Sequence, residues 1–169
     1  PLWVFVQLSG NRERRMVPTA AQVQLQVYAA LAYGAQGIMY WALAPSHAGP
    51  GYAPALLDER GGPTDRYDAI AALNAEVHAL GPTLLQLDPV EVGFSAPGNQ
   101  VGIEHDLFTS IDRTDALVVG EARSDPACMV SHFRGSADGA DYLLVVNRDL
   151  RRKPTFRLRL GAQADSVQL

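Results

Sequence analysis

A short apolar run, Gly37-Ile38-Met39-Tyr40-Trp41-Ala42-Leu43, constrains the fold of this chain more than any other segment. A helix-ending segment, Gly34-Ala35-Gln36, precedes the run, and a Pro- and Gly-rich loop from Ala44 to Thr64 follows it. An apolar segment of this length between turn signals predicts a buried parallel strand within a βα unit. Because α/β barrels place their active sites at the carboxyl ends of such strands, Trp41 is the first candidate for a ligand contact. A sugar is the ligand class that best suits an indole face.

The segments around this run predict a β-α-β-α order for the first half of the chain. Leu2–Leu8 is a second predicted strand, and helices are predicted where apolar residues recur every three or four positions. Thr19 and Gln22 form a capping box at the start of the first helix, and Gly34 supplies its C-terminal stop. The first helix spans Ala20–Tyr33, with Val23, Val27, Ala30, Leu31 and Gly34 on its buried face. The second spans Asp65–Leu80, with Tyr67, Ile70, Leu73, Val77 and Leu80 on its apolar face and Gly81-Pro82 as its end.

After Pro89 the apolar pattern changes from the period of a helix to the period of two that is typical of strands. Several short alternating runs follow, separated by turn clusters such as Gly135–Gly139, and together they predict an antiparallel sandwich. The domain boundary is therefore placed at residues 88–89. The predicted strands are Val90–Phe94, Leu117–Val119, Cys128–Phe133, Tyr142–Val146 and Phe156–Leu160.

Composition excludes several classes of protein. The chain has 169 residues, of which 47% are hydrophobic and 19% charged, as in a globular protein. A net charge of −4 argues against nucleic-acid binding, and no apolar run approaches the roughly 20 residues of a membrane span. Cys128 is the only cysteine, so it is predicted to be buried and unpaired. The chain passes from Pro1 straight into a predicted strand, and it stops at Leu169 in the middle of another. We therefore expect a piece of a longer protein, and the lack of targeting signals says nothing about the compartment of that protein.

The order of segments in this chain resembles that of clan A glycoside hydrolases, in particular the beta-galactosidase-like members. Leu2–Gln7, the helix opened by Pro18-Thr19 and the run Ala29–Trp41 resemble strands 7 and 8 of their (β/α)8 barrel. The segment Leu56–Thr64 is similar to their final loop, and Tyr142–Arg148 to a strand of the β-sandwich that often follows the barrel. The order is more specific than any single motif.

The resemblance implies an α/β plus all-β fold: the last two βα units of a (β/α)8 barrel over residues 1–88, then an antiparallel β-sandwich over 89–169, both incomplete. A closed barrel takes about 250 residues, so two βα units are about a quarter of one. The remainder of the barrel would then be a partner of this chain, together with a carbohydrate. The parent enzyme is expected to be extracellular or periplasmic.

Glycosidases use two carboxylates, which lie about 5–5.5 Å apart when one is the nucleophile and wider when water attacks. The resemblance places the nucleophile at the carboxyl end of strand 7, where alternation puts Trp3, Phe5 and Gln7 on the inward face. Gln7 thus stands where a glutamate is expected. A neutral amide cannot attack the anomeric carbon, but it can hydrogen-bond a sugar hydroxyl. The alternatives are an amide satisfied within the barrel mouth, a shifted strand register, or a nucleophile elsewhere, and the catalytic residues are not assigned.

Other residues near the same mouth are candidates for substrate binding. Trp41 is expected to be a platform under a sugar ring, with a core tryptophan as the alternative. Asn11 and Arg15 in the loop after the first strand, and His47 in the loop after the second, are candidate contacts, with solvent-facing side chains as the alternative. The carboxylates near this mouth are weaker candidates, as surface ion pairs or turn residues: Glu13, Asp58 and Glu59.

The remaining motifs indicate no cofactor and no metal. His47, His78, His105 and His132 have no common spacing, and no pair forms a zinc template. The sequence also lacks a nucleophile elbow, a phosphate-binding loop and a dinucleotide fingerprint. Three hypotheses remain: a glycosidase piece that supplies part of the sugar-binding wall, a non-catalytic carbohydrate-binding or scaffold protein on the same fold, and an unrelated small α/β plus β-sandwich protein. The third predicts that both strand faces are covered within the chain, whereas the first predicts an open inward face.

Overall fold

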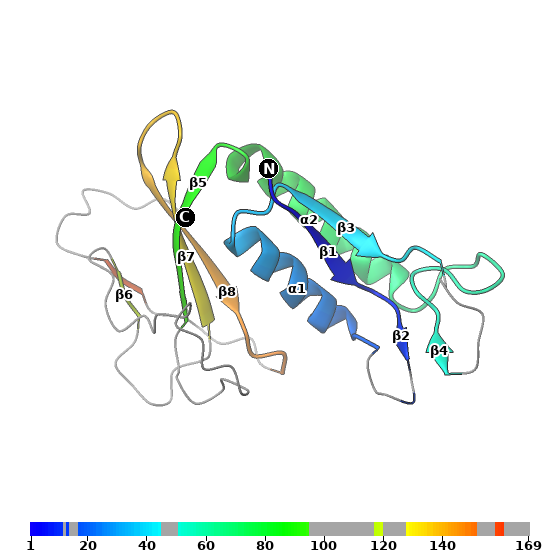
Figure 1. Cartoon of the computed structure of the whole chain (residues 1–169). Coiled ribbons are helices and arrows are strands. Elements are labelled where there is room, and N and C mark those ends of the chain that lie inside the picture. The colour runs from blue at the N-terminus through cyan, green and yellow to red at the C-terminus, as the bar shows by residue number, and fades with distance from the viewer. Residues whose placement is uncertain are drawn as a thin grey trace.

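The computed structural model describes residues 1–11, 13, 17–44, 51–94, 117–119, 128–151 and 158–160, and Figure 1 shows their arrangement. Among the sequence-derived candidates, Arg15 and His47 lie outside the described residues, as does His105. No helix in the described ranges is long and apolar enough to cross a lipid bilayer.

The first half of the chain contains the predicted β-α-β-α succession, with two additional two-residue strands, β2 (Gly10–Asn11) and β4 (Tyr52–Ala53), in its loops. Strand β1 (Trp3–Gln7) pairs in parallel with β3 (Gly37–Trp41), and α1 (Ala20–Ala32) connects the two. The second helix, α2 (Tyr67–Leu84), follows β3 after a long loop. Both helices pack on one face of the strand pair, where the core forms. Its buried residues are Val6, Leu8, Val23, Val27, Leu31, Leu56, Ile70 and Leu73, with Ile38 and Tyr40 of β3 packed against them.

Helix α1 begins and ends as its sequence predicts. The Thr19 hydroxyl accepts a hydrogen bond from the Gln22 backbone N–H at 3.3 Å, and the Gln22 side chain accepts one from the Thr19 N–H at 2.8 Å, which confirms the capping box. Gly34 has φ of 78°, a left-handed conformation that favours glycine, and a Cβ there would lie 2.8 Å from the Pro89 ring. The helix therefore stops where the chain turns toward β3.

Helix α2 differs from its prediction at the C-terminal end. The expectation that Gly81-Pro82 ends the helix was wrong, because α2 continues through Pro82 to Leu84. Proline removes one N–H donor, and the carbonyl that loses its partner belongs to His78, which is exposed to solvent. The Gln86 side chain donates to the Pro82 carbonyl at 2.9 Å and helps to close the final turn.

The predicted apolar face of α2 is buried only in its middle. Ile70 and Leu73 are buried and Val77 is half-buried, whereas Tyr67 and Leu80 at the two ends are exposed. At its last residue, Leu84, the helix packs against the core again.

The second half forms antiparallel sheets. Helix α2 ends at Leu84 and strand β5 begins at Leu87, close to the boundary predicted at residues 88–89. Strand β5 (Leu87–Phe94) pairs with β7 (Cys128–Gly135), which pairs in turn with β8 (Asp141–Asn147). A register shift between Pro89 and Glu91 interrupts β5. A separate antiparallel pair joins β6 (Leu117–Val119) to β9 (Leu158–Leu160). The barrel and the sandwich stay predictions at this point.

The three-stranded sheet packs on α1, on the side away from β1 (Figure 1). Met129 and Val146 form a buried cluster with Ala32, and the buried Ser131 hydroxyl donates to the Ala32 carbonyl at 2.5 Å. Cys128 is buried, as predicted.

Candidate functional site

The candidate site lies at the carboxyl ends of β1 and β3. In the parallel register Gln7 is the partner of Trp41, so the two residues predicted from sequence are neighbours. The Trp41 carbonyl accepts hydrogen bonds from the backbone N–H of Leu8 at 2.8 Å and of Ser9 at 3.2 Å. The peptide bond from Trp41 to Ala42 is cis. The backbone of Trp41 is thus held by the two residues that follow Gln7.

The helix-free face of β1 and β3 is apolar and open. Trp3, Phe5 and Trp41 are 60%, 63% and 55% exposed, although Val6 and Leu8 on the other face are fully buried. The alternation that predicts an inward face for Trp3, Phe5 and Gln7 thus agrees with the burial along β1. Large aromatic side chains of this exposure mark either an interaction surface or a ligand site.

Two close contacts organise the aromatic side chains on this face. The rings of Phe5 and Trp41 are 6.2 Å apart between centroids, and their planes meet at 81°. The Trp3 indole lies across Gly37, because a Cβ on Gly37 would come within 2.4 Å of that ring. Each strand therefore contributes to holding an aromatic side chain of the other.

The Gln7 side chain is half-buried and bonded to the local backbone. Its Nε2 donates to the Ser9 carbonyl at 3.0 Å, and its backbone N–H donates to Gln26 Oε1 of α1 at 3.1 Å. The amide of Gln7 thus has a hydrogen-bond partner in the backbone two residues further on. A carboxylate at the same position has no N–H, so it could not make the hydrogen bond to the Ser9 carbonyl.

The loops that follow the two strands meet beside this edge. Strand β2 (Gly10–Asn11) pairs antiparallel with β4 (Tyr52–Ala53), with Asn11 opposite Tyr52. Asn11 Oδ1 accepts a hydrogen bond from the Glu13 backbone N–H at 2.9 Å. A Cβ on Gly51 would lie 3.2 Å from the Glu13 carboxyl carbon, so this carboxylate reaches the second loop. Asn11 and Glu13 are therefore placed at the junction of the two loops.

Asp58 and Glu59 lie in a turn, which the sequence analysis gave as the alternative to a catalytic role. Asp58 Oδ1 accepts from the backbone N–H groups of Arg60 and Gly62, each at 2.8 Å. Gly61 in this turn has φ of 80°. Glu59 is exposed beside it. The Asp58 carboxylate thus stabilises its own loop.

Arg66 is a residue that sequence reasoning missed. Its guanidinium donates to the carbonyls of Leu8 at 2.5 Å, Pro18 at 3.2 Å and Ala55 at 3.0 Å, and also to that of Pro54. It ties the segments after β1 and β4 to the start of α2. The only sequence signal was its place at the N-terminus of a helix, where the helix dipole disfavours a cation.

Two tyrosines lie on the helix side of the strand pair and serve packing. The Tyr28 hydroxyl of α1 donates to Glu76 Oε2 of α2 at 3.0 Å, and that of Tyr40 donates to Asn74 Oδ1 at 2.6 Å. Burial, followed by the hydrogen bond to Glu76 and the charge of that carboxylate, raises the pKa of Tyr28 to about 12. Burial raises the pKa of Tyr40 as well.

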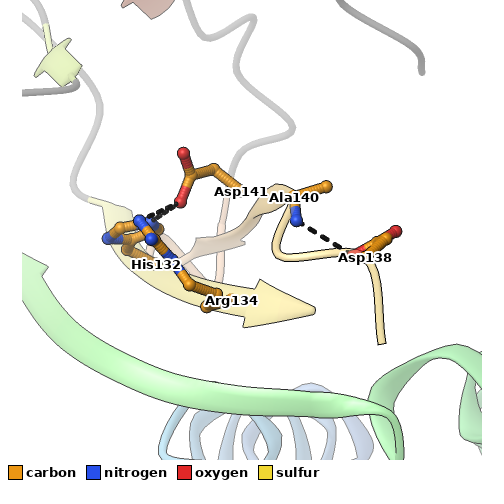
Figure 2. A network of polar contacts seen from close by, with 5 residues as sticks. All are labelled: His132, Arg134, Asp138, Ala140 and Asp141. Carbon is orange, nitrogen blue, oxygen red and sulfur yellow. Dashed lines mark hydrogen bonds and ion pairs between the residues drawn. The ribbon is translucent and has the colours of Figure 1, made fainter. Parts of the chain in front are cut away.

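A polar cluster on the β7–β8 hairpin contains His132, Arg134 and Asp141 (Figure 2). Asp141 Oδ1 lies 2.8 Å from His132 Nε2 and 2.9 Å from Arg134 Nη2. The hydrogen bond to His132, aided by the charge of Arg134, lowers the pKa of Asp141. Ser131 faces α1 on the other side of β7, so its hydroxyl does not accompany His132. The cluster is a set of cross-strand pairs at the surface.

The described residues contain no group of three or more His, Cys, Asp or Glu side chains placed to hold a metal ion. Comparison of the chain with protein-family models and with curated proteins found no match.

Proposed function

We propose that this chain is the C-terminal part of a glycoside hydrolase that cleaves glycosidic bonds in oligo- or polysaccharides. It would hold strands 7 and 8 of a (β/α)8 barrel, followed by a β-sandwich. Its role in the parent would be to supply part of the sugar-binding wall.

The one-sided placement of the helices supports the barrel. Parallel sheets are normally covered on both faces. Here α1 and α2 cover one face, while Trp3, Phe5 and Trp41 leave an aromatic and uncovered surface on the other. A barrel provides the second cover by closing the sheet on itself, with side chains of all strands filling the interior. The remainder of the barrel is accordingly the proposed partner of this face.

The observation that carries the proposed function is the pairing of Gln7 with Trp41. Both lie at the carboxyl end of parallel strands, the edge at which barrel enzymes bind substrate. The exposed indole offers an apolar face to the C–H groups of a pyranose ring, while an amide beside it offers a donor and an acceptor to hydroxyl groups. Asn11 and Glu13 reach the same edge from the following loop.

The reaction would need two carboxylates, one to protonate the leaving oxygen and one to stabilise or attack the anomeric carbon. The acid/base would come from a strand outside this chain. Gln7 cannot replace either carboxylate, because an amide neither ionises nor carries a transferable acidic proton near neutral pH. We therefore expect the 169-residue piece to be inactive by itself.

Gln7 also favours a second candidate, a non-catalytic carbohydrate-binding or scaffold protein on the same fold. In that protein the mouth would retain its aromatic platform and its hydrogen-bonding amide but lack the nucleophile. The two candidates differ in hydrolysis and agree in sugar binding.

The test uses the complete gene product and a panel of 4-nitrophenyl glycosides that differ in sugar and anomeric configuration. Hydrolysis that Trp41→Ala reduces by about tenfold or more in kcat/KM would support the enzyme, since tenfold corresponds to about 1.4 kcal/mol of lost transition-state stabilisation. Leu43→Ala, which removes another exposed apolar side chain just beyond β3, is the matched control. Sugar binding without hydrolysis would select the second candidate, and neither activity would refute both.

A further inference from the structure

Phe5 and Trp41 form a perpendicular pair across the two parallel strands. Their centroids are 6.2 Å apart at an interplanar angle of 81°, within the range that edge-to-face aromatic pairs prefer. Phe5 is the register partner of Met39, so it lies diagonally opposite Trp41. Both rings stand on the helix-free face.

Within this chain, the rest of the Trp41 surroundings hold its backbone and leave its ring exposed. Hydrogen bonds from Leu8 and Ser9 hold its carbonyl, whereas more than half of the residue is exposed. An exposed side chain ordinarily samples several rotamers, and ordering it costs conformational entropy when a ligand binds. Among the described aromatic residues, Phe5 is the one in ring contact with the Trp41 indole.

We infer that Phe5 is a positioning residue, which holds the indole plane of Trp41 ready to receive the apolar face of a sugar. This inference rests on the proposed function. Phe5 acts through Trp41, lowering the ordering cost of binding without a hydrogen bond of its own to the ligand. An edge-to-face pair contributes about three- to tenfold in an equilibrium constant, and we expect sugar affinity to change by that factor.

The test labels the complete gene product with 5-fluorotryptophan and assigns the ¹⁹F resonance of Trp41 as the one absent from Trp41→Phe. Phe5→Leu keeps an apolar side chain of similar size but removes the ring, and we expect it to shift and broaden the Trp41 resonance. Phe5→Tyr restores a ring and should restore the resonance. Trp3→Phe, a change on the same strand and face, is the matched control and should leave the Trp41 resonance in place.

Sugar affinity is then measured from the same resonance with methyl β-D-glycosides of galactose, glucose, mannose and xylose. The inference is supported if Phe5→Leu weakens the sugars that wild type binds by about three- to tenfold and Phe5→Tyr restores them. An unchanged Trp41 resonance in Phe5→Leu, or unchanged sugar affinity, overturns it. If Phe5→Leu perturbs Trp41 but none of the four sugars binds the wild type, Phe5 still orders the indole and the proposed function fails instead.

Discussion

The Ser131 hydroxyl donates a 2.5 Å hydrogen bond to the carbonyl oxygen of Ala32, the last residue of α1. The bond joins the central strand of the antiparallel sheet to the helix that covers the parallel strands. A carbonyl in the final turn of a helix has no partner within the helix, so a donor from outside satisfies it.

Ser131→Ala should destabilise the chain by about 1–3 kcal/mol, because it leaves a buried carbonyl unsatisfied. Urea unfolding followed by circular dichroism measures the change. Ser136→Ala is the matched control, since the exposed Ser136 hydroxyl bonds Asp88 at the surface, and it should alter stability by less than about 0.5 kcal/mol. Equal effects of the two substitutions would contradict a structural role for the bond to Ala32.

Arg66→Met should destabilise the chain more than any single surface charge change, by about 2–4 kcal/mol, since bonds to a charged donor contribute about 1.5–3 kcal/mol each and neighbouring ones are not additive. Arg66→Lys should recover only part of the loss, because an ammonium lacks the planar fork that reaches several carbonyls. Arg60→Met on an exposed turn is the control. Full stability in Arg66→Met, measured by thermal unfolding, would show that these carbonyls find water instead.

Gly37→Ala should cost about 1–3 kcal/mol, because the new methyl group would lie within 2.4 Å of the Trp3 indole. A second change, Trp3→Val, should relieve most of that cost and so reveal coupling in a double-mutant cycle. Gly81→Ala within α2 is the contrasting substitution. Nothing lies within 4 Å of the Cβ that this change adds, and the free energy of unfolding should rise by about 0.5–1 kcal/mol. Additive effects at Gly37 and Trp3 would refute the proposed clash.

Stability should fall in alkaline solution partly through Tyr28. Its pKa is raised from the ordinary tyrosine value of 10.0 to about 12 in the folded chain. A raised folded pKa means that the phenol contributes its stabilisation fully below pH 10 and loses it as the pH rises toward 12. Tyr28→Phe should therefore flatten the stability curve between those values, as measured by urea unfolding at each pH.

Glu76→Gln separates the causes of this shift. It removes the neighbouring charge but leaves the burial that is the larger cause, so the Tyr28 pKa should stay above 10 while falling below its wild-type value. Ultraviolet titration of the phenolate measures it. A return to the ordinary tyrosine value would show that burial contributes nothing.

The sequence predicted the presence of the helices better than the residues at which they end. The capping box at Thr19 and the stop at Gly34 depend on side chains within a few residues, so the pattern alone locates α1. The end of α2 was misjudged, because a proline loses one hydrogen bond and an exposed carbonyl turns to water at little cost. Whether the lost hydrogen bond ends a helix depends on whether the carbonyl is buried or exposed, which the local sequence does not show.

The candidate site also contains some features that the sequence predicts and others that it does not. Strand alternation predicts the face of each strand on which Gln7 and Trp41 lie, whereas the register that makes them partners comes from the structure. By contrast, the carbonyls that Arg66 binds come from segments up to 58 residues away in the chain, and no periodicity reveals such a cluster. The contact of Phe5 with Trp41 depends on side-chain rotamers, which the register limits but does not determine.

Helix α1 faces two sheets, and two residues take part in both of the clusters that it forms. Tyr28 of α1 and Leu144 of β8 pack against the core of the parallel strands and also against the cluster around Met129. Loss of α1 would strip apolar cover from both sheets at the same moment. A substitution on the buried side of α1 is therefore expected to disturb the packing of both sheets.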